Sequence, residues 1–109
     1  IDAFINAGFN YFDTAHGYIS GKSEIAIGKC LSARYNREDF VLANKLSDWY
    51  FEKEEDIIPL FESQLQICGV DYFDFYIFHC LTRKSYPKHR ECNTFEIVKK
   101  LKEEINKKK

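Results

Sequence analysis

The apolar positions of this chain follow two different periods, which predict helices alternating with strands. A helical repeat marks four segments, and nearly continuous apolar runs mark the stretches between them. The predicted helices cover 1–7, 22–35, 52–68 and a last segment that starts at Asn93 or Thr94. The predicted strands lie within 9–15, 38–46 and 71–81. The order is therefore one helix followed by three strand–helix units.

Local signals set several of these boundaries. Gly8 and Gly69 follow helical repeats, and glycine often ends a helix because it adopts the left-handed conformation without strain. Ser23 is predicted as the N-cap of the second helix, with Glu24 in its first turn. The apolar stripes are Ile27, Cys30 and Leu31 on the second helix, Ile57, Phe61, Leu65 and Cys68 on the third, and Ile97, Leu101 and Ile105 on the last.

Strands that alternate with helices pair in parallel through crossover connections. The strand within 38–46 is apolar almost throughout, as in a parallel sheet that is covered on both faces. Three such units fit either an open doubly wound sheet or part of a (β/α)8 barrel. The hydrophobic pattern alone leaves both of these α/β folds open.

The amino-acid composition limits the kinds of partner that this chain is expected to bind. The 109 residues make at most one domain, and 45% hydrophobic with 30% charged residues is typical of globular proteins. The net charge is −1, from 16 basic and 17 acidic residues, so no overall field attracts nucleic acid or an anionic membrane. The basic residues within 99–109 predict the charged end of a helix.

Cysteine usage and the N-terminal residues bear on location. The four cysteines, at positions 30, 68, 80 and 92, show no C-x-x-C pair and no zinc-ligand spacing with histidine. Reduced thiols, mostly in apolar stretches, predict a cytoplasmic protein without a metal site. We also expect no leader peptide and no membrane span, because residues 1–9 lack a basic region and no apolar run is long enough.

Polar side chains close each predicted strand. Asp13 ends the first, Lys45 the second and His79 the third, with separations of 45 − 13 = 32 and 79 − 45 = 34 residues. The carboxyl ends of parallel strands lie on one face, where α/β barrels build their active sites. An acid, a base and an imidazole are therefore predicted to converge there. Tyr18 follows the first strand and can lean over them.

These residue types suit proton transfer. Lys45 can neutralise Asp13, and a positive charge beside the Tyr18 phenol favours its ionised form, which makes it a usable proton donor. His79 can orient a polar substrate oxygen. Taken singly, each of these residues is more often a cap, a surface group or a satisfied buried histidine. Their joint placement, one per successive strand, favours a site.

Other polar and aromatic residues near the strand ends are less informative. His16 and His89 lie in polar stretches without an evident partner and are predicted to face solvent. Trp49 and Tyr50 follow Lys45 closely and either wall a substrate pocket or cover the next helix.

The motifs "FDTAHGYISGKSEIAIGKCL", "REDFVLANKL" and "CGVDYFDFYIFHCL" resemble the aldo-keto reductase family, and bacterial members in particular. The resemblance spans nearly the whole chain and includes D-T-A-x-x-Y, the strand-end lysine and the strand-end histidine in order. It implies a (β/α)8 barrel that reduces small aldehydes or ketones with NADPH.

The resemblance also implies a role for each strand-end residue. Tyr18 would be the general acid, Lys45 would activate it, Asp13 would hold Lys45, and His79 would orient the carbonyl. Asp13 and Tyr18 would contact the cofactor, whereas Tyr18, His79 and Trp49 would contact the substrate.

Length departs from the family pattern. A full barrel needs roughly 250 residues, so residues 1–109 are expected to form a single partial domain covering about the second to fourth strands. The parts that hold the phosphates and adenosine of NADPH are expected outside this chain. We therefore expect a fragment that is inactive alone and able to self-associate through open sheet edges.

Two alternatives come from other functional classes. One is a catalytically silent βα module that acts as an interaction or structural domain. The other is a barrel hydrolase that uses Asp and His to bind a metal. The second is disfavoured because no His-x-His motif and no further strand-end carboxylates are present.

Overall fold

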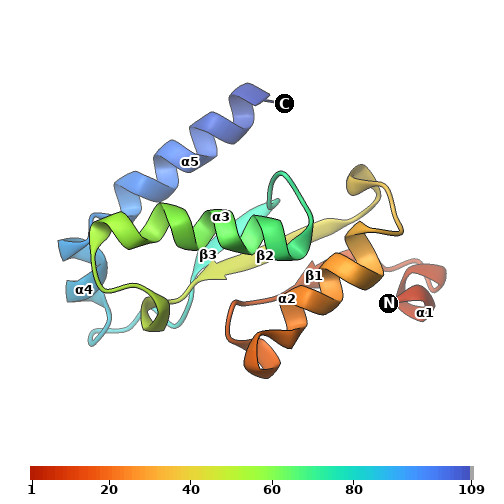
Figure 1. Ribbon diagram of the computed structural model, residues 1–109, viewed down its shortest axis with the longest axis horizontal. Coiled ribbons are helices and arrows are strands. Elements are labelled where there is room, and N and C mark those ends of the chain that lie inside the picture. Colours follow the sequence, from red (N-terminus) through yellow and green to blue (C-terminus); the bar gives the residue numbers. More distant parts are fainter. Residues whose placement is uncertain (109) are drawn as a thin grey trace.

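The computed structural model describes residues 1–108, with side chains described through Ile105. Eight regular elements follow one another along the chain (Figure 1). They are α1 (Asp2–Asn6), β1 (Tyr11–Asp13), α2 (Lys22–Ile27), β2 (Val41–Leu46), α3 (Ile57–Cys68), β3 (Phe75–Phe78), α4 (Tyr86–Glu91) and α5 (Thr94–Lys108). Short 3₁₀ turns and one π turn, Gly28–Ser32, connect them.

The three strands form one parallel sheet in the order β1-β2-β3. Asp13 pairs with Ala43, and Lys45 pairs with Ile77. This register aligns the carboxyl ends of all three strands at the same edge. The predicted parallel α/β arrangement is confirmed.

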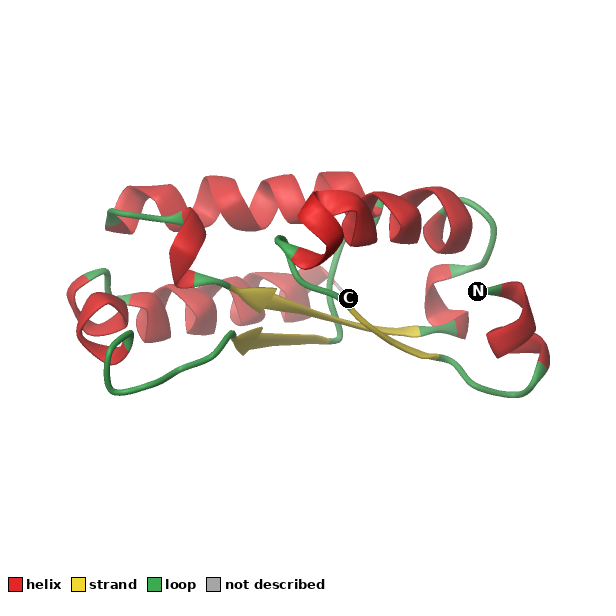
Figure 2. Ribbon diagram, turned by 90° about the horizontal axis from the view of Figure 1, so that it is seen from below, coloured by secondary structure: helices red, strands yellow, loops and turns green. Residues whose placement is uncertain are grey.

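The helices α2 and α3 cover one face of the sheet and enclose the core (Figure 2). Leu42 and Leu46 of β2 point into this layer and are fully buried. Leu31, Phe51 and Ile57 meet them from the helical side, each at most 1% exposed. Burying such side chains contributes about 1.5–3 kcal/mol each, so this layer stabilises the sheet from one side.

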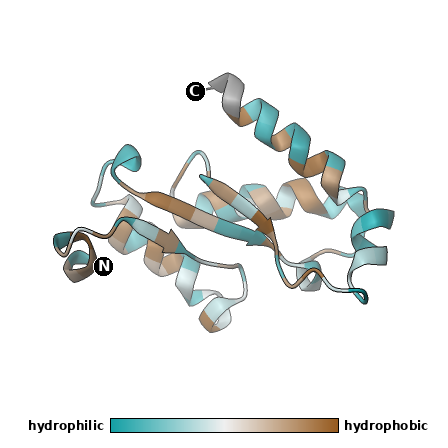
Figure 3. Ribbon diagram, turned by 180° about the vertical axis from the view of Figure 1, so that it is seen from behind, coloured by the Kyte–Doolittle hydropathy of each residue, from teal (hydrophilic) through white to brown (hydrophobic). Residues whose placement is uncertain are grey.

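The opposite face of the sheet is open. Tyr11 is 49% exposed, Phe75 55% and Ile77 47%. Figure 3 views this side, with the strands in front of the helices and much of their length apolar. The sequence predicted burial on both faces of the strand within 38–46. Within the described residues that is true of β2, whereas β1 and β3 are exposed at alternate positions.

Two glycines set how α3 ends and how it packs. Gly69 closes α3 in the left-handed conformation at φ 67°, as its position predicted. Gly28 lies where the backbone after α2 approaches the end of α3. A Cβ at Gly28 would stand well inside van der Waals contact of the Ile67 carbonyl oxygen. Glycine therefore permits the close approach of these two segments.

Some predicted boundaries need correction. The helix predicted over 22–35 is α2 followed by the π turn, and it begins at Lys22 after Gly21, so Ser23 is not its N-cap. The Ser23 hydroxyl instead hydrogen-bonds Thr14 Oγ1 at 2.7 Å. The strand within 9–15 has only three residues. The short helix α4 was not predicted.

The cysteines divide into two pairs. Cys68 and Cys92 are buried, while Cys30 and Cys80 are exposed, so the predicted place of Cys30 in the apolar stripe is wrong. Burial raises the pKa of the Cys68 thiol to about 12. In the part of the chain that the structure describes, no helix has the length and apolar character needed to cross a bilayer.

Candidate active site

The carboxyl edge of the sheet brings together the four residues singled out in the sequence, here called the strand-end group (Asp13, Tyr18, Lys45 and His79). Asp13 is the last residue of β1, Lys45 lies one residue before the end of β2, and His79 directly follows β3. Because β2 is central, Lys45 stands between the other two strand ends. Tyr18 opens a 3₁₀ turn in the loop after β1.

Lys45 is the best-held member of the group. Its Nζ donates to Asp13 Oδ2 at 2.7 Å and to the Thr14 carbonyl oxygen at 2.9 Å. Lys45 is buried, whereas the Asp13 carboxylate is 46% exposed on the open face of the sheet. The ammonium group therefore has a fixed position, and Asp13 compensates its charge.

The Lys45 ammonium also faces Tyr18. Its Nζ lies 4.6 Å from the centre of the Tyr18 ring, a cation–π arrangement. The sequence led us to expect contact with the Tyr18 hydroxyl, and among the described contacts the structure places Lys45 against the ring face instead. Positive charge still lies beside the phenol ring.

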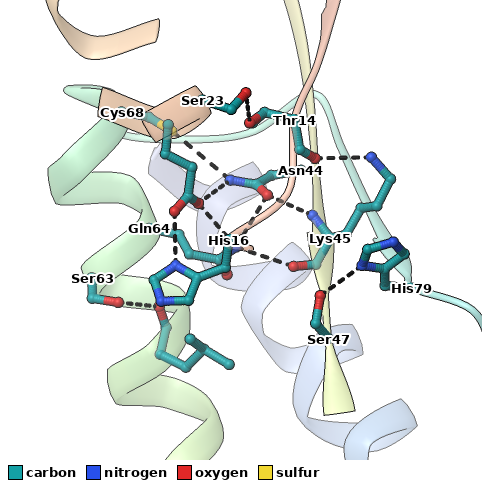
Figure 4. A network of polar contacts seen from close by, with 12 residues as sticks. Thr14, His16, Ser23, Asn44, Lys45, Ser47, Ser63, Gln64, Cys68 and His79 are labelled. Carbon is teal, nitrogen blue, oxygen red and sulfur yellow. Dashed lines mark hydrogen bonds and ion pairs between the residues drawn. The ribbon is translucent and has the colours of Figure 1, made fainter. Parts of the chain in front are cut away.

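His79 is held between two aromatic rings and a hydroxyl. Its ring meets Tyr18 and Trp49 edge-on, at centroid distances of 5.6 and 5.2 Å. Its Nδ1 hydrogen-bonds Ser47 Oγ at 2.8 Å (Figure 4). Burial, and secondly the Lys45 charge, lower the pKa of His79. A neutral imidazole whose Nδ1 accepts from Ser47 presents an Nε2–H donor. Ser47 was not identified from the sequence.

The loop after β1 carries backbone strain next to Tyr18. Ile19 has φ 51° and Ser20 has φ 54°, both in the left-handed region. This conformation is unfavourable for a β-branched residue such as Ile19, which is 74% exposed. Strained backbone persists only where surrounding contacts fix it. The loop that positions Tyr18 must therefore be held by contacts elsewhere.

A buried polar cluster behind the strand ends provides such contacts. It is called here the Glu24 network, and its members were not predicted to act together: His16, Glu24, Asn44, Gln64 and Tyr76. Glu24, Asn44 and Gln64 are fully buried. The members come from separate segments, and only their long-range contacts reveal the cluster.

Two histidine predictions are wrong. His16 is partly buried, and its Nδ1 donates to Glu24 Oε1 at 2.7 Å. His89 is fully buried among Phe51, Phe78 and Phe95. Its polar neighbours in sequence gave no sign of this, because the aromatic surroundings come from other elements.

The remaining predicted contacts are aromatic. Trp49 is 61% exposed and packs edge-on against His79, so it lies where it can wall a substrate. Tyr50 packs against His16 instead. Among the described residues, no group of three or more His, Cys, Asp or Glu side chains is arranged to hold a metal ion.

Comparison with known proteins identifies the family. The model of the aldo/keto reductase family matches residues 1–106. The chain belongs to the aldo/keto reductase family. It is 42% identical over 60 residues to norsolorinic acid reductase B of Dothistroma septosporum, covering 55% of this chain and 15% of that protein. It is 49% identical over 47 residues to aryl-alcohol dehydrogenase (NADP+) of Phanerodontia chrysosporium, covering 43% of this chain and 12% of that protein.

A solved structure shows where this aldo/keto reductase chain sits in the family fold. The aldo/keto reductase from Brucella melitensis superposes with a TM-score of 0.70 at 28% identity, covering 92% of this chain and 37% of that chain. The three parallel strands and their helices therefore correspond to part of a (β/α)8 barrel, as predicted. The chain spans well under half the length of these relatives.

Proposed function

We propose that this segment supplies the proton-transfer side of an NADPH-dependent reductase of aldehydes or ketones. The observation that carries the proposal is the Lys45 ammonium, which is fixed by Asp13 at 2.7 Å and lies 4.6 Å from the Tyr18 ring centre. Membership of an oxidoreductase family supports it. The relative from Phanerodontia chrysosporium is named for NADP+, which favours that cofactor.

Each member of the strand-end group has a task in this proposal. The neutral imidazole of His79 donates from Nε2 to the carbonyl oxygen and so orients it. The Tyr18 hydroxyl gives its proton to that oxygen as the alcohol forms. The Lys45 ammonium stabilises the phenolate that remains, and Asp13 keeps Lys45 in place. Solvent then returns a proton to Tyr18.

This chemistry requires a cofactor, which would contact the site from the open face of the sheet. When bound, NADPH would supply the hydride that adds to the carbonyl carbon. Asp13 is half exposed and Tyr18 partly exposed at the open face, so both can contact a bound nicotinamide ring. Trp49, also exposed, can contact the substrate from the side of His79.

The test is a barrel graft, in which residues 1–106 replace the matching segment of the Brucella melitensis enzyme. We expect this graft to oxidise NADPH in the presence of aldehydes. Tyr18→Phe should lower kcat by about 10²–10⁴-fold, the usual contribution of a positioned proton donor, with little change in NADPH affinity. The control is Tyr86→Phe on α4. A Tyr18→Phe graft with near-normal kcat would show that Tyr18 is not the acid.

A further inference from the structure

The Glu24 carboxylate is a buried junction between three elements. His16 Nδ1 donates to its Oε1 at 2.7 Å. Asn44 Nδ2 and Gln64 Nε2 donate to its Oε2 at 2.8 and 3.1 Å. With these three donors, both carboxylate oxygens accept hydrogen bonds. Glu24 itself is fully buried on α2, so this junction draws the β1 loop, β2 and α3 onto one side chain.

Two of the three donors are close in the chain to a member of the strand-end group. His16 lies two residues before Tyr18, in the loop whose backbone is strained at Ile19. Asn44 directly precedes Lys45, and its Oδ1 accepts from the Lys45 backbone N–H at 2.8 Å. The two residues whose relative position decides proton transfer are therefore tied to the same carboxylate.

The third donor, Gln64 of α3, strengthens this connection from the helical side of the sheet. Gln64 Nε2 also contacts Asn44 Oδ1 and the Lys45 carbonyl oxygen, each at 3.1 Å. Tyr76 of β3 donates to Gln64 Oε1 at 2.5 Å, which connects the next strand. The Lys45 backbone is thus held on both its N–H and its carbonyl group by members of the Glu24 network.

We propose that Glu24 is a positioning residue for the strand-end group: through His16 it holds the loop that carries Tyr18, and through Asn44 it holds the strand that carries Lys45. This inference rests on the proposed function. A buried carboxylate is costly, and a well-packed apolar side chain often stabilises a core as well or better. A hydrogen-bonding carboxylate has one advantage over an apolar side chain: it fixes the relative position of the segments it binds. That position matters for Tyr18 and Lys45.

The first test detects the connection between Glu24 and the strand-end group without any catalysis. Histidine ring ¹⁵N and ¹H signals are recorded for the 109-residue chain and for Glu24→Gln, which is matched in shape and lacks the charge. The His16 signals should change because its acceptor has changed. The His79 signals should also move, because the Tyr18 ring that packs edge-on against His79 would shift. The control is Glu62→Gln on the exposed side of α3, which should leave both unchanged.

The second test uses the barrel graft. Because about 1 Å of misplacement can cost 10²-fold in rate, Glu24→Gln should lower kcat by about 10- to 100-fold, with KM changed less than about twofold. His16→Gln, at a partly exposed position, should give the same direction of effect and serves if Glu24→Gln does not fold. Glu62→Gln should behave as the parent.

The outcomes separate the two proposals. A parent graft without turnover would contradict the proposed function, while the His79 signals would still report on the tie. A folded Glu24→Gln or His16→Gln chain whose His79 signals match the parent would overturn the positioning role. So would a Glu24→Gln graft with parental kcat.

Discussion

Single side chains in this protein owe their properties to contacts that are distant in sequence. Lys45 is held by Asp13 and the Thr14 carbonyl group, and the pKa of His79 is lowered by burial and by Lys45. The strand-end group could be predicted because Asp13, Lys45 and His79 lie at strand ends and Tyr18 follows the first of them in the next loop. The burial of His89 could not, because "YPKHRE" is polar and its aromatic neighbours are brought in by tertiary packing.

At the scale of single residues, His89 is expected to make the stability of this protein depend on pH. Its Nδ1–H donates to Thr94 Oγ1 at 3.1 Å, and its buried Nε2 has no hydrogen-bond partner among the described residues. Burial lowers the pKa of His89 below the ordinary value of 6.5. The unfolded chain therefore takes up the proton first as the pH falls. Stability should be full above about pH 6.5 and decline below it.

We expect His89→Asn to weaken that decline. Asparagine keeps a donor for Thr94 and binds no proton in this range. Urea unfolding at a series of pH values between about 7 and 5, a range that spans the histidine titration, should give a shallower loss of unfolding free energy than in the parent. His79, whose pKa is also lowered, would account for part of the remaining slope. Identical slopes for parent and variant would contradict this assignment.

Among the elements, prediction succeeded where periodicity was long and failed where it was short. The twelve residues of α3 and its stop at Gly69 were predicted because apolar residues recur on one face. The six residues of α4 have no such repeat. The helix predicted over 22–35 changes to a π turn at Gly28, where close packing on α3 overrides local preference.

The contact of Gly28 with α3 gives a prediction at this scale. Gly28→Ala would push a methyl group against the Ile67 carbonyl oxygen, so the two segments would have to separate. We expect a loss of about 1–3 kcal/mol in unfolding free energy, as for overpacked cores, measured by denaturant titration. Lys29→Ala, at an exposed neighbouring position, should change stability little. Equal stabilities for Gly28→Ala and the parent would show that the backbone approach is looser.

At the scale of the whole molecule, one covered and one open sheet face define the chain. The parallel order and part-barrel fold followed from alternating periodicity together with the family motifs. The Glu24 network could not be predicted in this way, because members that contact one another lie up to 40 residues apart in the sequence. No local spacing marks them. Polar residues such as Gln64 within an apolar helical stripe are the only sequence signal that could have pointed to it.

The open face and the free edges of β1 and β3 predict self-association of the 109-residue chain. Unpaired strand edges beside exposed apolar side chains favour pairing with another chain. Sedimentation should show species larger than a monomer. Ile77→Lys, on the open face, should shift the distribution toward monomer. Ile19→Lys, equally apolar but in a loop, should not. A monodisperse monomer of the parent chain would contradict this prediction.

The central claim is that the fixed Lys45 charge beside Tyr18 makes this segment the proton-transfer side of a carbonyl reductase. The most direct measurement is kcat for aldehyde reduction by the barrel graft carrying Lys45→Met, with Lys99→Met on the exposed side of α5 as control. The account predicts a fall of at least about 10²-fold for Lys45→Met and none for Lys99→Met. Equal kcat values for the two variants would contradict it.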